Sequence, residues 1–239
     1  MKKSIVSMIL VLFTILSFVG CGNISYEDND NSDNNEGTTD VNLKEGSEES
    51  DDNANYILFG TYEQDGNLGN GTEPIQWIPL FEQDGNVLLI SRYILDYKEF
   101  NDTTIASATS WENSTLRKWL NGDFLNSAFS SSEKNRIVTT TVQDYRADNV
   151  LGETTSDKVF LLNKDQVFTY FASDSARATT STAYAKTQKT YVTNAYWLIN
   201  SYSSDLYKYL INAEGRNENN PRVNESEGIR PVIWISKEG

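Results

Sequence analysis

The chain has 239 residues and a formal net charge of −14, from 34 acidic and 20 basic residues. It has no histidine and only one cysteine, which excludes a Ser-His-Asp triad, a Cys-His pair, an imidazole ligand for zinc and any disulfide within the chain. The acidic balance provides no basic footprint for nucleic acid, so we expect no such partner.

The N-terminus has the layout of a bacterial lipoprotein signal. Two lysines give it a positive start, Ile5–Val19 carry no charge, and Cys21 follows closely. The uncharged run is shorter than the roughly 20 residues that span a bilayer, which favours a cleaved signal. We therefore expect residues 1–20 to be a signal peptide and Cys21 to carry the lipid that holds the protein on the extracellular face of the membrane. Phe18 departs from the usual leucine, and the alternative is an ordinary signal or a retained anchor with an incidental cysteine.

The next segment, residues 21–55, is predicted to be a disordered acidic tether. Residues 22–55 contain eleven Asp or Glu residues against Lys44, a net of −10. Such a composition buries too little apolar surface to offset the entropy of ordering the chain. Removing this −10 and the +2 of the first two lysines from −14 leaves −6 for residues 56–239. That remainder is long enough for one hydrophobic core, and we predict one globular domain.

Short strands dominate the start of this domain. Apolar or alternating runs predict strands at 56–60, 75–78 and 86–90. The tetrad Gln-Asp-Gly-Asn occurs at 64–67 and at 83–86, and Asp-Gly between apolar runs is a hairpin turn signal. Neither tetrad has the ligand spacing of an EF-hand, although a structural Ca²⁺ held by Asn and Asp loops stays open. We predict no other cofactor.

The clearest helix is predicted to begin near residue 115, where Asn113 or Ser114 can cap its free amides. Leu116 and Trp119 then fall at helical spacing on one apolar face. Many short, mostly antiparallel strands with two or three short helices indicate a single α+β domain. The later elements are strands at 137–142 and 159–162, a short helix after Asn163, and closing strands at 196–199, 206–211 and 229–235.

Several of these segments resemble one bacterial family. Residues 111–121, which include Trp111, Asn113, Arg117 and Trp119, are similar to the signature of the domain-of-unknown-function 6273 family. The resemblance implies a surface or secreted domain of a Gram-positive bacterium, but no activity, because none is established for the family. The chain departs from the family at 199–202, which lack its arginine and Ser-Pro-Gly turn. Further similar segments lie at 59–62, 74–78, 89–96, 157–162, 173–177 and 228–235, so the resemblance covers nearly all of 56–239.

Three arginines in these segments are expected to be structural. Because buried arginines are normally paired, Arg117, Arg177 and Arg230 should lock the helix and strands to acids such as Asp174. The last part of the chain has a tryptophan strand, a hairpin, a Gly-x-Arg-Pro segment and an apolar strand, in that order. This order also resembles C-type-lectin-like and formylglycine-generating-enzyme-like domains. This second resemblance implies a C-type-lectin-like topology.

The aromatic content of 5 Trp, 13 Tyr and 10 Phe suggests a recognition surface. Residues 191–209 mix tyrosines with Asn and Ser, which is typical of adaptable polar-aromatic surfaces, and a tyrosine-rich edge hairpin is the alternative. We predict that Tyr196, Tyr202 and Tyr207 lie partly exposed on one surface. Together with the loops around 178–190, they would contact a glycan, a peptide or another surface protein.

The sequence thus favours a membrane-anchored extracellular binding module without assigned catalytic residues. Two alternatives stay open. A hydrolase would need two carboxylates about 5–10 Å apart in one cleft, and its candidates Asp157, Asp165 and Asp174 have no distinguishing spacing. A structural component of the cell envelope would show neither a cleft nor an aromatic patch.

Overall fold

The structure, a computed structural model, describes residues 56–103 and 109–237, so the predicted signal peptide and tether lie outside the described residues. No helix within these two ranges is long and apolar enough to cross a membrane. The elements in chain order are β1 (Ile57–Tyr62), β2 (Glu73–Gln83), β3 (Asn86–Ser91), β4 (Asp96–Glu99), α1 (Thr115–Trp119), the π-helical turn η1 (Leu120–Phe124), α2 (Leu125–Ala128), α3 (Ser131–Arg136), β5 (Thr140–Tyr145), the 3₁₀ turn η2 (Ala147–Asn149), β6 (Leu151–Asp157), β7 (Val159–Phe160), α4 (Lys164–Tyr170), α5 (Asp174–Arg177), α6 (Ala183–Thr187), β8 (Tyr196–Ser201), β9 (Tyr207–Ile211), β10 (Asn217–Arg222), β11 (Ser226–Ile229) and β12 (Val232–Ser236).

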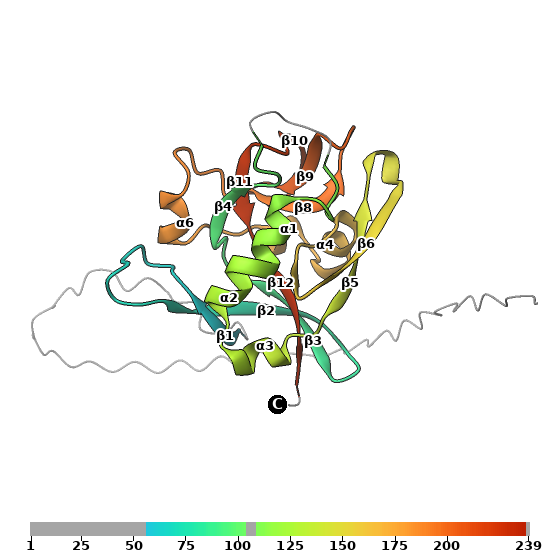
Figure 1. Cartoon of the computed structure of the whole chain (residues 1–239). Coiled ribbons are helices and arrows are strands. Elements are labelled where there is room, and N and C mark those ends of the chain that lie inside the picture. Colours follow the sequence, from blue (N-terminus) through green and yellow to red (C-terminus); the bar gives the residue numbers. More distant parts are fainter. Residues whose placement is uncertain (1–55, 104–108, 238–239) are drawn as a thin grey trace, which may run out of the picture. The chain divides into compact units, whose positions relative to one another are not determined.

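Two five-stranded sheets and one ribbon form the domain. The first sheet has the order β1-β2-β3-β12-β7, the second has the order β10-β9-β8-β11-β4, and β5 pairs with β6. Paired strands are antiparallel except β8 and β11, which are parallel. Figure 1 shows the first sheet below, the second above, and the helix of α1 and α2 running between them. Strands with a few short helices in one domain confirm the α+β prediction.

The two Gln-Asp-Gly-Asn tetrads differ in structure. The second joins β2 to β3 through Asp84 and Gly85, whose φ angles of 50° and 74° are those of a tight hairpin turn. The first lies in the longer loop 63–72 between the antiparallel strands β1 and β2, where Gly66 has a φ of 81°. Both tetrads therefore belong to hairpins, but only the second is a two-residue turn.

The predicted helix is present and begins as expected. Ser114, rather than Asn113, is its cap, because the Ser114 hydroxyl accepts a hydrogen bond of 3.1 Å from the backbone amide of Arg117. The helix continues through η1 into α2, which Figure 1 shows as one rod. Leu116 and Leu120 are buried on its inner face, and Trp119 is half-buried.

Three of the short helices depend on their caps. Ser131-Ser132-Glu133-Lys134 resembles a helix start and begins α3, which has 6 residues. The helices α5 and α6, with 4 and 5 residues, were not predicted, because they are too short to show apolar periodicity. Each begins at a hydroxyl side chain that accepts a backbone hydrogen bond from inside the helix, supplied by Ser130, Ser173 and Thr182. These single turns depend on their caps rather than on an apolar face.

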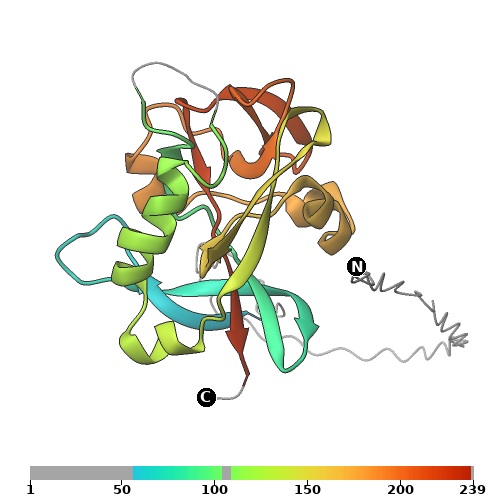
Figure 2. The same ribbon diagram turned by 45° about the vertical axis from the view of Figure 1, so that its right-hand side comes forward.

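The predicted closing strand at 229–235 is wrong as one element. It divides at Arg230 and Pro231 into β11 of the second sheet and β12 of the first sheet. Proline has no N–H to donate to a strand ladder, so pairing stops there and the chain crosses between the sheets. The predicted strand at 137–142 is likewise displaced to β5, which pairs with β6 as a two-stranded ribbon of its own (Figure 2).

Candidate functional site

A surface pocket of about 460 Å³ opens beside β1, β2 and α6. This volume is within the roughly 300–1,000 Å³ typical of sites for small ligands. Its lining combines apolar side chains, amides, hydroxyls and two carboxylates. We call it the Tyr93 pocket, and its lining residues are Leu58, Gln64, Asp65, Glu73, Pro74, Gln76, Tyr93, Ser181 and Thr182.

Backbone pairing brings three distant segments to this pocket. Leu58 and Gln76 are cross-strand neighbours of β1 and β2, so their side chains share one face. The amide of Arg92 donates to the carbonyl of Gln76 over 2.8 Å, which places Tyr93 at the end of the same sheet. Beyond it, the amide of Ile94 donates to Thr180 and the amide of Thr182 donates to Ile94, at 3.0 and 3.1 Å. These bonds fix residues 181–182 as the opposite wall.

The loop 63–72 closes the pocket on the acidic side. The amide nitrogen of the Gln64 side chain donates to the carbonyls of Glu73 and Pro74, at 3.1 and 3.0 Å. The carbonyl of Gln64 accepts from the backbone amide of Tyr184 over 2.9 Å. The loop is therefore tied both to the start of β2 and to the first turn of α6.

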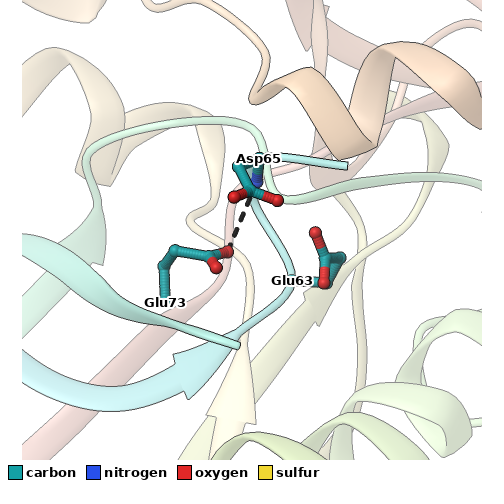
Figure 3. Close-up of side chains that lie close together, drawn as sticks. All are labelled: Glu63, Asp65 and Glu73. Carbon is teal, nitrogen blue, oxygen red and sulfur yellow. Dashed lines mark hydrogen bonds between the residues drawn. The ribbon is translucent and has the colours of Figure 1, made fainter. Parts of the chain in front are cut away.

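Three carboxylates meet in this loop, as Figure 3 shows. Glu63, Asp65 and Glu73 each offer an oxygen, and these oxygens lie within 4.8 Å of one another. Glu63 is buried and accepts from the amide of Gly66 at 2.8 Å, while Glu73 accepts from the amides of Gln64 and Asp65 at 2.7 and 3.3 Å. Carboxylates thus hold the loop in shape.

The carboxylate of Asp65 stays ionised in spite of its neighbours. Hydrogen bonds from the Asn70 side chain and the Asn67 amide, at 2.8 and 2.6 Å, lower the pKa of Asp65. Among the described residues, no lysine or arginine forms an ion pair with Asp65, Glu63 or Glu73. Three acids with no counter-charge favour a cation, and oxygen ligands at this spacing are of the kind that Ca²⁺ takes.

Strand pairing alone does not predict this acidic group. Tyr62 and Glu73 are partners in the antiparallel β1–β2 register, so Glu63 and Thr72 come next in line. Since successive side chains of a strand point to opposite faces, it is the loop after β1 that brings the Glu63 and Glu73 carboxylates together. The sequence prediction placed structural calcium only in Asn and Asp loops and assigned no role to either glutamate. It did place ligand contacts around 178–190, and Ser181 and Thr182 of that segment line the pocket.

The predicted tyrosine surface is wrong at Tyr196. This side chain is 1% exposed, because it lies in β8, whose residues are all buried in the middle of the second sheet. Its hydroxyl donates to the carbonyl of Arg177 over 3.1 Å. Tyr202 and Tyr207 are half-buried, and Tyr202 packs edge-on against Tyr209 with ring centroids 5.2 Å apart. The three predicted tyrosines therefore share no exposed surface.

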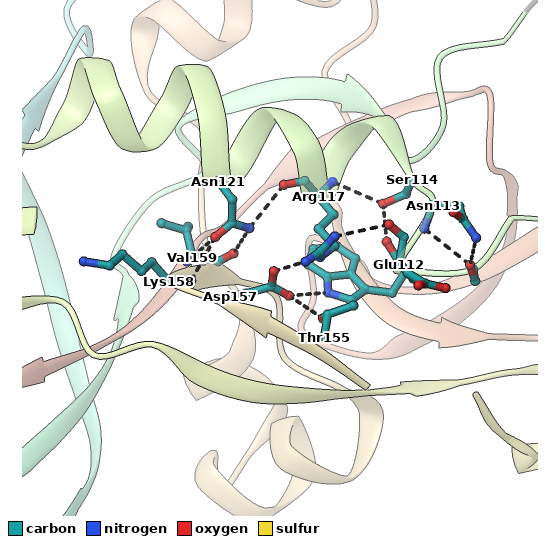
Figure 4. A network of polar contacts seen from close by, with 11 residues as sticks. Glu112, Asn113, Ser114, Arg117, Asn121, Thr155, Asp157, Lys158 and Val159 are labelled. Atoms are coloured by element: carbon teal, nitrogen blue, oxygen red, sulfur yellow. Dashed lines mark hydrogen bonds and ion pairs between the residues drawn. The ribbon is translucent and has the colours of Figure 1, made fainter. Parts of the chain in front are cut away.

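The family-like segment 111–121 is bound into the interior through Asp157, as Figure 4 shows. The carboxylate of Asp157 accepts from Arg117 Nε at 2.7 Å, from the indole N–H of Trp111 at 2.9 Å and from the Thr155 hydroxyl at 2.6 Å. Asp157 and Trp111 are almost fully buried. These contacts tie the start of the helix to the end of β6.

The remaining residues of the predicted structural motif differ in their partners. Asn113 donates through its side chain to a local group, the Ser110 hydroxyl, at 3.0 Å. Trp119 lies under the ammonium of Lys98, which is 4.5 Å from the ring centroid. These contacts hold the start of the helix and one edge of β4.

Arg177 and Arg230 are both buried, but only one is paired with an acid. Arg177 forms the predicted ion pair with Asp174. Arg230 has no acidic partner among the described residues, which corrects the prediction for it. Its guanidinium instead donates to the carbonyls of Ser91 and Arg177 at 2.8 and 3.1 Å, and to the Tyr196 hydroxyl at 3.3 Å. It thereby joins the two sheets at the point where the chain crosses between them.

A buried charge network under β5 and β9 was not predicted. Lys208 is fully buried, donates to the Ser201 hydroxyl over 2.9 Å and lies 4.3 Å from the ring centroid of Phe100. Burial lowers the pKa of Lys208 to about 8, and burial also raises the pKa of nearby Asp144. Within the described residues, Asp144 Oδ1 is buried without a hydrogen-bond partner. Strand alternation carried this signal, since Lys208 and Leu210 fall on one face.

The three candidate acids of a hydrolase lie in separate surroundings. Asp157 is buried in its ion pair with Arg117, Asp174 is paired with Arg177, and Asp165 is exposed at the start of α4. None of the three lines the Tyr93 pocket. No observation therefore favours these acids as a catalytic pair.

Comparison with known proteins adds one finding. The model of a family described as a domain of unknown function, DUF6273, matches residues 84–237. No curated protein and no solved structure matches the chain significantly. The matched range includes Tyr93, Ser181 and Thr182 of the pocket, while the other six lining residues precede it.

Proposed function

The chain belongs to the DUF6273 family, a family of unknown function, and we propose that it is a lipid-anchored extracellular module that binds a ligand in the Tyr93 pocket. The observation that carries this proposal is the pocket itself. It has the volume of a small-ligand site, and its walls combine an aromatic ring and aliphatic side chains with amides and carboxylates that can orient a ligand.

Anchoring is part of the same proposal. Cys21 follows an uncharged run and is the proposed attachment point of the lipid. The acidic segment 22–55 would separate the domain from the membrane by about 5–6 Å × √n, where n is the number of residues in a flexible linker. A segment of this composition has strong self-repulsion, which extends it further. The pocket would then face the cell exterior, where glycans, peptides and surface proteins are available as ligands.

We also propose that the topology is related to C-type-lectin-like domains. Support comes from the order of the closing elements: the strand with Trp197, the hairpin of β9 and β10, the Gly228-Ile229-Arg230-Pro231 segment and the apolar strand β12. An experimental structure that superposes on such a domain with the same strand order would support the relation, and a different order would contradict it.

Binding is tested with the full chain purified in detergent against glycans, cell-wall fragments and peptides. The variant Leu58→Arg changes an exposed wall of the pocket and should abolish binding of the ligands found. Its control is Leu68→Arg, the same change at an exposed leucine outside the lining, which should leave binding unchanged. Failure of every ligand class with a folded chain, or ligands insensitive to Leu58→Arg, would refute the pocket.

A further inference from the structure

We infer that the Tyr93 pocket recognises a primary ammonium group carried on an aliphatic chain, as in the lysine side chain of a peptide or protein. This inference rests on the proposed function, since it names the ligand class of the same site. Three observations support it: the charge of the lining, the absence of a counter-ion, and the chemistry of the remaining walls.

The lining carries negative charge only. Asp65 and Glu73 are its two ionisable acids, and no lysine or arginine is among its residues. Glu63 lies directly behind them with an oxygen within 4.8 Å of both. Because like charges this close repel one another, a positive group placed between them gains from all three. An anionic ligand is disfavoured by the same charges.

Among residues 56–103 and 109–237, no lysine or arginine side chain forms an ion pair with these acids. Arg92 is the basic residue that precedes Tyr93 of the pocket wall in the sequence. Its guanidinium lies 4.0 Å from the ring centroid of Tyr56 and 5.0 Å from that of Tyr93. It also donates to the side chain of Gln76 over 2.8 Å. Arg92 therefore supports the aromatic wall and is not paired with the acids. The acids are therefore open to a cation that a ligand supplies.

The rest of the pocket selects an organic cation over a bare metal ion. Leu58 is 63% exposed, and Pro74 and Tyr93 stand beside it, so the walls next to the acids are apolar. A metal ion would use the carboxylates but leave most of the 460 Å³ volume in contact with these apolar groups. An aliphatic chain that ends in an ammonium group covers the apolar walls and reaches the acids at once.

The acids can accept such a group without rebuilding the loop. Loop amides donate to Glu73 Oε2 and Glu63 Oε1, and no hydrogen bond from the loop to the second oxygen of either glutamate is among those of the described residues. An ammonium group has three donors and no acceptor, which matches a cluster made only of acceptors. The geometry is thus formed before the ligand arrives.

The test uses isothermal titration calorimetry on the full chain with two matched probes. Nα-acetyl-lysine methylamide carries the ammonium group, and Nα-acetyl-norleucine methylamide has the same aliphatic chain without it. The lysine probe should bind about tenfold or more tightly than the norleucine probe, and this advantage should shrink as salt is raised. The variants Glu73→Gln and Asp65→Asn should each bring the two probes close to equal affinity.

The chain supplies a matched control for the substitution. Asp84 occupies the same position of the second Gln-Asp-Gly-Asn tetrad as Asp65 does of the first, but it lies in the β2–β3 turn outside the lining. Asp84→Asn should keep the full preference for lysine. Equal melting temperatures of the variants and the parent show that a loss of preference reflects charge and not unfolding.

The possible results distinguish a failure of the ammonium inference from a failure of the proposed binding function. Equal binding of both probes, with Leu58→Arg abolishing it, would overturn the ammonium inference and leave the pocket as a binding site. A second result would overturn the ammonium inference in favour of a metal ion: a heat of binding for calcium chloride alone that Glu73→Gln removes, together with no preference for the lysine probe. No binding of either probe while a glycan binds at the pocket would overturn it as well. No ligand of any class at the pocket would refute the proposed function itself.

Discussion

The buried ammonium group of Lys208 should make the stability of the domain rise with pH in the alkaline range. A lysine in the unfolded chain keeps its proton up to a pKa of 10.5, whereas burial lowers the pKa of Lys208 in the folded chain to about 8. Between these values the unfolded chain binds more protons than the folded chain. The free energy of unfolding therefore increases as the pH rises through this window.

The size of the effect follows from the same two values. Holding Lys208 charged in the core costs about 3 kcal/mol at pH 7, at about 1.4 kcal/mol per pKa unit, and roughly 2 kcal/mol of this cost is relieved by pH 9.5. The variant Lys208→Met has no ammonium group, so it should lack this rise.

The measurement is urea unfolding followed by tryptophan fluorescence at several pH values from 7 to 9.5. The difference between parent and Lys208→Met should move by about 2 kcal/mol in favour of the parent over this range. Comparing two chains removes the contribution of the tyrosines, which both contain. Lys118→Met, at an exposed position of α1, is the control and should follow the parent. Parallel curves for parent and Lys208→Met would refute the reasoning.

Three further predictions concern close packing, a buried ion pair and anchoring. Gly215→Ala should destabilise the domain by at least about 2 kcal/mol more than Gly85→Ala in urea unfolding. An added Cβ at Gly215 would lie 1.7 Å from the Asp174 carbonyl oxygen, whereas one at Gly85 meets nothing within 4 Å, and φ is similarly positive at both glycines. Equal losses of stability would contradict this prediction. Asp157→Ala should lower the free energy of unfolding by about 3 kcal/mol, because it leaves a buried indole N–H and an arginine unpaired; a loss below about 1 kcal/mol in the same assay would be too small for a buried pair. Cys21→Ala should abolish metabolic palmitate labelling of the protein in cells, and labelling that persists would reject the lipid anchor.

Local patterns predicted most of the elements but not how they cross between sheets. The strand β3, the helix beginning at Ser114 and the turn at Asp84-Gly85 follow from short-range signals in the sequence. The division of the closing strand at Pro231 was missed because apolar residues stand on both sides of Arg230 and Pro231 and were assigned to one strand. A proline inside that run was the available signal, since its lack of an N–H ends a central strand.

Burial patterns were harder to predict than element types. Tyr196 was assigned to the surface because the stretch 191–209 mixes tyrosines with Asn and Ser, but all six residues of β8 are buried, so both faces of this strand are covered. Neither sheet order nor coverage is encoded in a single strand. Lys208 is the opposite case, because alternation with Leu210 indicated an inward position that the charge argued against.

The pocket could not be predicted because its walls are joined by long-range backbone contacts. The bonds between Ile94 and residues 180–182 form a single bridge between loops, and no periodicity in the sequence marks such a pairing. The register of β1 and β2 pairs Tyr62 with Glu73, and the predicted strands at 56–60 and 75–78 reached neither residue. The Glu63 and Glu73 carboxylates meet through the loop between the strands, so neither the acidic side of the pocket nor its outline was within reach of the sequence.

The family-like helix segment and the acids of the Tyr93 pocket are held by separate sets of contacts. Segment 111–121 is anchored through Asp157 to the end of β6, and this anchor lies inside the range that the DUF6273 model matches. The acids of the pocket precede residue 84 and are held by a loop whose hydrogen bonds are almost all internal to residues 63–74. Changes in that loop can thus alter the charge of the pocket without disturbing the helix anchor. The DUF6273 match therefore covers the helix anchor, while the acids of the proposed ligand site precede it in this chain.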